Sequence, residues 1–249
     1  MRSAVDDDYD FYPCLVDGAH ASIYVNLRFE HDAVVGADTR YSVTWQLRDP
    51  GPHGIGTAEE AELANACEEA VIEQAEELDL VYVGRLRTAG TWEVTFYGAA
   101  GQLDCLREVA NTRDDRGGEA SAAPDPDWRY YRELLLPDAE RRQWMDDRRM
   151  AQVLQEQGDA LRTPRRVDHH ASFPTGQTRD AFVEAARREG FELEIASHDA
   201  DRERPFGAHV FRVDPIELAH IHEVVMILAD AAAAQHGRYD RWVAAIERG

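Results

Sequence analysis

The stretch that holds Asp168, His169, His170 and Ser172 contains the side-chain types of a hydrolase. A carboxylate, an imidazole and a hydroxyl form a catalytic triad only when the fold aligns them, so sequence spacing alone does not establish one. The chain lacks the G-x-S-x-G motif, which places a serine on a sharp strand-to-helix turn. A hydrolase that uses Asp168, His169 or His209 is therefore the least favoured of the functions that we weigh for this chain.

The paired histidines are spaced wrongly for a shared metal ion. His169 and His170 are neighbours on a predicted strand, where successive side chains face opposite sides. His220 and His222 are two apart on a predicted helix, which turns them roughly 200° away from each other. The chain has no H-E-x-x-H motif either. We therefore expect neither a metal site nor a cofactor.

Acidic residues and cysteines supply no ligand set. The run of acids at residues 6–10 resembles the start of a calcium loop, but Phe11 stands where such a loop needs glycine. The three cysteines, Cys14, Cys67 and Cys105, are far apart and form no C-x-x-C pair. We interpret the acidic run as a solvated terminus and the cysteines as idle thiols in a reducing compartment.

The segment "GRYDRW" near the end of the chain places Tyr239, Asp240 and Trp242 close together. The two aromatic rings could fold back and close the core, with Asp240 binding backbone amides or an arginine. They could instead form an exposed patch for a protein partner, because Tyr and Trp are favoured interface anchors. If a binding surface exists, we expect it to involve Tyr239, Asp240 and Trp242, together with Asp168 and His169.

The charge and the absence of lysine exclude several function classes. The net charge of −21 divides into −17 for residues 1–138 and −4 for residues 139–249. An acidic surface repels phosphate backbones, so we expect no direct binding of nucleic acid and a basic protein as partner. All 27 basic residues other than histidine are arginines, which excludes Walker P-loops, protein kinases and pyridoxal Schiff bases. The chain has no apolar run of membrane-spanning length and no apolar signal core at its start, so we expect a cytoplasmic protein without a membrane role.

Residues 1–138 are predicted to form an acidic N-terminal α+β domain. Aromatic and β-branched runs predict strands at 11–18, 21–29 and 41–49, a hairpin at 80–98 and a last strand at 128–136. Thr57 and Glu60 form a capping box that begins a helix. Its predicted buried stripe is Leu63, Cys67, Val71 and Leu78, and eight glutamates make its solvated face. A short helix is expected at 102–110, and the polar stretch 111–126 is expected to be a loop or a linker.

Residues 139–249 are predicted to form a second domain that begins with an arginine-rich helix. Strands are expected at 164–173, 191–197 and 208–213. Thr178 is expected to cap a helix that ends at Gly190, and Asp214 is expected to cap the last helix, with Pro215 in its first turn. The inner face of that helix would carry Ile221, Val224, Val225 and Leu228. The order β-α-β-β-α matches a ferredoxin-like split βαβ sandwich, so the predicted fold class is α+β with two α/β-sandwich domains.

Several motifs carry a resemblance to known families. "VDHHASF", "FVEAARREGFELEI", "HVFRVDPIELAHIHEVVMILADAAAAQHG" and "GRYDRW" make the C-terminal half similar to the regulator of ribonuclease E activity B (RraB) family. In that family the ending usually reads Tyr-Asp-Gly-Trp, whereas Arg241 stands here in place of the glycine. "DFYPCLVDGAHASIYVNLRF", "YVGRLRTAGTWEVTFYG" and "DWRYYRELLLP" make the N-terminal half resemble a bacterial domain-of-unknown-function family (number six-nine-five), which is often fused ahead of RraB-like domains.

The resemblance implies a protein-binding role without catalysis. RraB-like proteins are understood to bind ribonuclease E, largely through its scaffold region, and to restrain RNA decay. The leading hypothesis is therefore a regulator that inhibits ribonuclease E, and the acidic charge suits docking on an arginine-rich scaffold segment. The alternative is an interaction module for an unrelated protein partner, because a fold does not fix a function.

Overall fold

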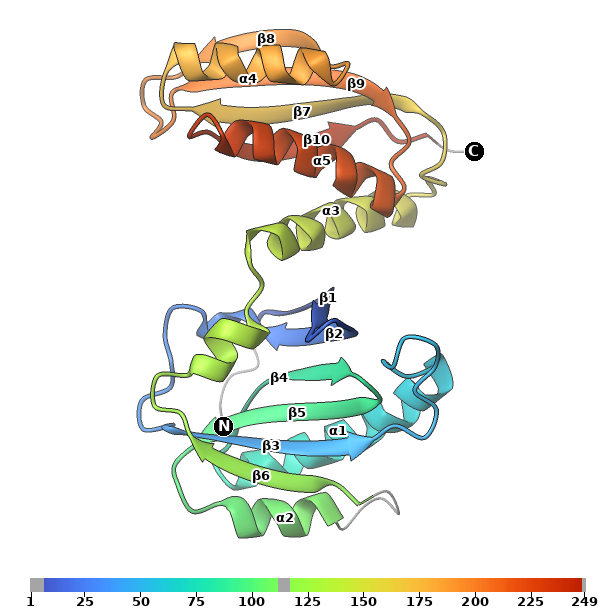
Figure 1. Ribbon diagram of the computed structural model, residues 1–249, viewed down its shortest axis with the longest axis vertical. Coiled ribbons are helices and arrows are strands. Elements are labelled where there is room, and N and C mark those ends of the chain that lie inside the picture. The colour runs from blue at the N-terminus through green and yellow to red at the C-terminus, as the bar shows by residue number, and fades with distance from the viewer. Residues whose placement is uncertain (1–6, 112–116, 248–249) are drawn as a thin grey trace. The chain divides into compact units, whose positions relative to one another are not determined.

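The computed structural model describes residues 7–111 and 117–247 of the chain (Figure 1). Asp6 of the acidic run and residues 112–116 of the expected linker lie outside the described residues. The chain divides into two compact units, Met1–Arg141 and Arg142–Gly249, each with its own sheet. This confirms the α+β class. Within the described ranges, no helix has both the length and the apolar character that a membrane crossing requires.

Unit 1 is built on a six-stranded antiparallel sheet with the order β1-β2-β4-β5-β3-β6. Helices α1 (Ala58–Glu77) and α2 (Leu103–Asn111) pack against one face, where Val43, Trp92 and Phe96 are fully buried. The predicted hairpin is present as β4 and β5. The strands are β1 Tyr9–Val16, β2 Ala19–Asn26, β3 Thr39–Gln46, β4 Val81–Thr88, β5 Thr91–Gly98 and β6 Glu119–Pro124; a short 3-10 helix, η1, spans Leu27–Phe29.

Helix α1 begins as predicted, but its buried stripe is rotated by about one residue. The side chain of Thr57 accepts a hydrogen bond from the backbone N–H of Glu60 at 3.3 Å. Leu63 was expected to be buried and is instead exposed, while Ala64, Glu68, Val71 and Ala75 face the sheet. The expected acidic face is therefore partly wrong. Glu68 is buried because its carboxylate binds inward-facing donors, the hydroxyl of Tyr82 at 2.6 Å and Nε1 of Trp92 at 2.7 Å.

The segment 119–136 differs from the prediction at both ends. Part of the expected linker is strand β6, which pairs with β3 along the sheet edge. The expected strand at 128–136 is helical instead, with residues 129–130 forming a helical turn that continues into the short π-helix η2 (Tyr131–Leu135). Its cause is Asp125, whose carboxylate accepts hydrogen bonds from the backbone N–H groups of Arg129 at 2.8 Å and Tyr130 at 3.1 Å. These bonds cap a helical turn in place of a strand.

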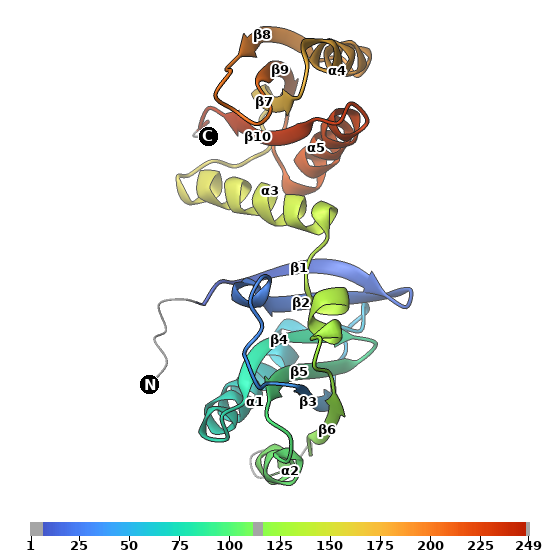
Figure 2. The same cartoon turned by 90° about the vertical axis from the view of Figure 1, so that its left-hand side faces the viewer.

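Unit 2 contains a four-stranded antiparallel sheet with the order β10-β7-β9-β8. Helices α4 and α5 lie side by side on one face of this sheet, as both views show (Figures 1 and 2). The order from β7 to α5 is the predicted β-α-β-β-α, and β10 completes a ferredoxin-like fold. The elements are α3 Ala139–Glu156, β7 Arg165–Phe173, α4 Gly176–Arg188, β8 Glu192–His198, β9 Phe206–Asp214, α5 Leu218–Ala233 and β10 Arg238–Ala244.

Two helix starts in unit 2 differ from the prediction. Thr175, and not Thr178, caps α4, and the two residues form a reciprocal capping box. Helix α5 begins after Glu217, because Asp214 still belongs to β9. The carboxylate of Asp214 binds Arg212 at 2.8 Å, so it is not available as a helix cap. Gly190, with a φ of 86°, follows the end of α4 as predicted.

Candidate interaction surface

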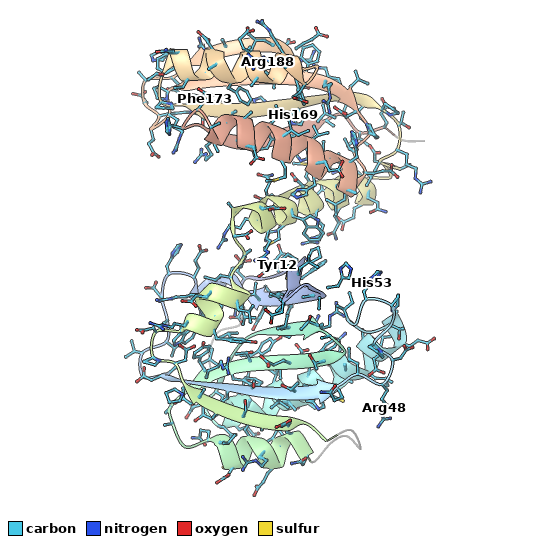
Figure 3. All side chains as sticks on the ribbon, in the orientation of Figure 1. Tyr12, Arg48, His53, His169, Phe173 and Arg188 are labelled. Carbon is cyan, nitrogen blue, oxygen red and sulfur yellow. The ribbon has the colours of Figure 1, made fainter. Side chains whose placement is uncertain are left out.

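Side chains along β7 alternate between the two faces of the sheet, so residues that are neighbours in the sequence lie on opposite faces. Val167, His169, Ala171 and Phe173 face the helices and are buried. Figure 3 labels His169 and Phe173 on this strand. Asp168 and His170 alternate with them and belong to the opposite face of the sheet. Neighbours on this strand therefore serve different surfaces, and His169 is a core residue.

A β-bulge in β10 brings Tyr239 and Trp242 to the same face. Tyr239 is paired with Ala171 and Trp242 with His169, and the register shifts between Tyr239 and Arg241. Without the shift, residues three apart on a strand would face opposite sides. With it, both aromatic side chains are buried and Asp240 is left outside. Arg241 is not among the residues with positive φ, so this bulge does not require the glycine usual in RraB-like endings.

Buried polar contacts hold both aromatic residues in place. Nε1 of Trp242 donates to Oδ1 of Asp147 at 2.9 Å, and Nδ1 of His222 lies 2.9 Å from the other oxygen. The hydroxyl of Tyr239 lies 2.8 Å from Nδ1 of His169, whose Nε2 has no hydrogen-bond partner among the described residues. Tyr239 and Trp242 therefore belong to the core, in agreement with the first interpretation of "GRYDRW", in which the two rings close the core. No sequence pattern singled out Asp147, which is fully buried although it lies in an arginine-rich helix.

Burial also sets the protonation of this network. It raises the pKa of Asp147, although hydrogen bonds from His222, Gln143 and Trp242 oppose this shift. It lowers the pKa of His169 from 6.5 to about 4, so this imidazole is neutral near pH 7. It also raises the pKa of Tyr239 well above its ordinary value. Burial thus favours the neutral forms of His169 and Tyr239, which suits a structural role for these two side chains.

The opposite face of the sheet carries a polar network. Nε2 of His209 lies 2.8 Å from Oδ1 of Asp168, and the ring of His170 stacks on His209 at 4.4 Å. The guanidinium of Arg166 pairs with Asp168 at 2.7 Å and lies 3.9 Å from the ring centroid of Phe211. Hydrogen bonds from Arg166 and His209 hold the pKa of Asp168 below its ordinary value despite partial burial. These contacts fix the directions of the side chains on this face.

Apolar side chains lie beside this network in contact with solvent. Val213 is 63% exposed and Val243 is 38% exposed, and the cross-strand register aligns Val213 with Arg166 and Val243 with Asp168. In the part of the chain that the structure describes, the helices α4 and α5 both pack on the other side (Figure 2). We call the surface formed by Arg166, Asp168, His170, His209, Phe211, Val213, Asp240 and Val243 the open sheet face.

The open sheet face holds an Asp–His pair but not the rest of a triad. Ser172 is the serine nearest in sequence, and its hydroxyl donates to Asp240 at 3.1 Å rather than to a histidine. Asp240 also accepts a hydrogen bond from Arg238 at 2.8 Å, which agrees with the expected arginine pairing. Over residues 7–111 and 117–247, no three His, Cys, Asp or Glu side chains gather into a metal site. The geometry therefore favours a contact surface over a catalytic centre.

Comparisons with known proteins assign the two halves separately. The family model for the regulator of ribonuclease activity B (RraB) matches residues 144–243, and the model for a family of unknown function (DUF695) matches residues 7–136. Both resemblances expected from the sequence are confirmed. No curated protein matches the chain. A crystal structure of an unknown protein from Galdieria sulphuraria is 11% identical, with 83% of this chain and 98% of that chain covered and a TM-score of 0.23.

Proposed function

We propose a regulatory function for this chain, which belongs to the family of unknown function (DUF695) and continues into a segment matched by the RraB model. In this proposal the protein binds ribonuclease E or its scaffold region in the cytoplasm and restrains RNA cleavage without catalysing a reaction. The observation that carries the proposal is the RraB match over residues 144–243, which spans every element that forms the open sheet face. The partner is a protein, and contact with RNA is indirect.

The composition of the open sheet face supports protein binding. Phe211, Val213 and Val243 supply apolar area, and Arg166 and Asp168 supply charges that are already oriented by contacts within the sheet. An interface commonly combines apolar or aromatic anchors with a polar rim. Side chains held in place before binding lose less conformational entropy on association.

The charge of the whole chain favours a basic segment as the occupant of this surface. The net charge of −21 attracts arginine- or lysine-rich chains at long range, whereas on the face itself Asp168 and Asp240 already pair with Arg166 and Arg238. An arginine-rich scaffold segment of a ribonuclease has this chemistry. Because exposed charges are screened by ions, we expect the affinity to fall as the salt concentration rises.

The test is a titration of the full chain against purified ribonuclease E from the same organism, paired with an RNA-cleavage assay. Val213→Asp places a charge on the open sheet face and should weaken binding about tenfold or more, with a matching loss of inhibition. Leu63→Asp is the matched control, because Leu63 is 57% exposed on α1, compared with 63% for Val213. Absence of binding by the unmodified protein would refute the ribonuclease proposal. Equal binding by the two variants would refute the open sheet face as its site.

A further inference from the structure

Unit 1 contains a hollow that the proposed function does not use. It lies where β3 and β6 meet the capped turn that leads into η2, and it is an open depression of about 360 Å³. This volume falls within the range of about 300–1,000 Å³ that is typical of small-molecule sites. Its lining includes Arg40, Asp125, Tyr130 and Glu133, with Pro124 and Leu134 as apolar neighbours. The hollow thus combines charged groups with apolar surface.

The guanidinium of Arg40 is held in place by an aromatic ring, and its N–H donors are not engaged by the described residues. The register of β3 sets it between Tyr97 of β5 and Ala123 of β6. The guanidinium lies 4.2 Å from the centroid of the Tyr130 ring, and the described residues give it neither a hydrogen bond nor an ion pair. A guanidinium stacked on a ring keeps its N–H donors directed outward in the ring plane, a geometry that suits a bidentate carboxylate.

The nearest carboxylate, Asp125, is already engaged. It accepts hydrogen bonds from the backbone N–H groups of Arg129 and Tyr130 and, at 2.6 Å, from the hydroxyl of Tyr97. Burial alone would raise the pKa of Asp125, but these bonds and the nearby charge of Arg40 lower it below its ordinary value. The second guanidinium of the lining, that of Arg129, lies 4.0 Å from Asp127 and is exposed at the rim. The oxygens of Asp125 are therefore occupied by bonds within the chain, and the N–H donors of Arg40 remain available to a bound ligand.

Glu133 brings the opposite charge to the same hollow. It belongs to η2, lines the hollow, and forms no ion pair among the described residues. The lining thus holds a guanidinium and a carboxylate to which the described residues give no hydrogen bond and no ion pair, although the charge of Asp125 acts on Arg40. A ligand that carries both a carboxylate and an ammonium group would satisfy both of them at once.

We propose that this hollow binds a small zwitterion of the amino-acid class. Its carboxylate pairs with Arg40, its ammonium group faces Glu133, and its side chain lies against Pro124 and Leu134. The proposal concerns unit 1 alone and does not depend on binding to a ribonuclease, so either proposal can fail without the other.

The test is calorimetric titration of the full chain with a mixture of the standard amino acids at millimolar concentration, followed by each one singly. Inorganic phosphate, succinate and ethylamine serve as probes that carry only one kind of charge. We expect saturable binding of at least one amino acid, a loss of about tenfold or more in affinity for Arg40→Gln, and a smaller loss for Glu133→Gln. Arg107→Gln on α2 is the matched control, because Arg107 is paired with Asp104 at 2.7 Å and is remote from the lining.

Each remaining outcome would overturn the proposal. The first is that no amino acid binds saturably. The second is that Arg40→Gln and Arg107→Gln bind equally well. The third is that phosphate or succinate binds more tightly than any amino acid. An unchanged affinity in Glu133→Gln would also overturn it, because the ammonium group would then have no recognised contact. Thermal unfolding of each variant without ligand establishes that a lost affinity is not a lost fold.

Discussion

Replacing Trp242 with phenylalanine removes one hydrogen bond and keeps most of the buried aromatic ring. Trp242 is 3% exposed, and its Nε1 donates to the fully buried carboxylate of Asp147 at 2.9 Å. A hydrogen bond to a charged group contributes about 1.5–3 kcal/mol. The smaller ring also leaves a small void, so we expect the free energy of unfolding of unit 2 to fall by about 3 kcal/mol in total.

The second substitution in this experiment is Asp147→Ala. It leaves the N–H of Trp242 without an acceptor in the core and also removes the partner of His222. Because each buried donor left without a partner costs about 1–3 kcal/mol, we expect a loss of about 3–5 kcal/mol for this substitution. Because the two substitutions share one hydrogen bond, the double variant should lose about 1–2 kcal/mol less than the sum of the single losses.

The assay is urea unfolding of the full chain, followed by circular dichroism and by tryptophan fluorescence. Trp92→Phe is the matched control, because Nε1 of Trp92 donates to the buried Glu68 of the other unit at 2.7 Å. That variant should weaken unit 1 and leave unit 2 unchanged. If the effects of Trp242→Phe and Asp147→Ala add fully, the hydrogen bond between them does not stabilise unit 2. If Trp242→Phe lowers partner affinity and leaves stability unchanged, Trp242 is a contact residue and the assignment to the core is wrong.

Three further predictions concern single residues. The pKa of His169 is about 4 in the fold and near 6.5 in the unfolded chain, so the unfolded chain takes up its proton first as the pH falls. The free energy of unfolding should therefore fall by up to about 3 kcal/mol as the pH decreases from 6.5 to 4. His169→Gln should remove this part of the pH dependence, as measured by denaturant titrations at several pH values. Gly84→Ala would press a Cβ against the carbonyl of Tyr24 at a φ of 153° and should cost about 3 kcal/mol by thermal unfolding, whereas Gly36→Ala, in open space at a φ of 81°, should cost about 1 kcal/mol. Glu68→Gln should lower the urea midpoint of unit 1 by an amount equivalent to about 2–3 kcal/mol, and an unchanged midpoint would show that its buried contacts contribute nothing net.

Local patterns predicted the order of elements in unit 2 well. The β-α-β-β-α order follows from alternating apolar residues and turn signals, and the buried residues Ile221, Val224, Val225 and Leu228 recur at helical spacing. Gly190 marks the end of α4 because positive φ is easiest for glycine. These features depend on residues close together in the chain, and for that reason they can be predicted from the sequence.

Features that depend on distant partners were missed. Residues 128–136 are rich in aromatic residues and read as a strand, but the carboxylate of Asp125 caps a helical turn there. Asp147 lies among charged neighbours and reads as exposed, but Trp242 and His222 reach it from β10 and α5. Of the expected contact residues, Asp168 and Asp240 lie on the open sheet face, whereas His169, Tyr239 and Trp242 are buried. The alternation of side chains along a strand does not reveal a β-bulge. The sequence therefore could not predict which of these five residues are buried and which are exposed.

The bulge in β10 allows two aromatic residues that are three apart in the sequence to face the same side of the sheet. Asp240 is the extra residue that allows Tyr239 and Trp242 to face inward together. A substitution at Asp240 keeps the residue count and should leave the inward direction of both rings unchanged. Deletion of Asp240 would leave Tyr239 and Trp242 two residues apart, a spacing at which regular alternation turns both rings inward without a bulge. We therefore expect homologous chains to separate the two aromatic residues either by two residues with a bulge or by one residue without it.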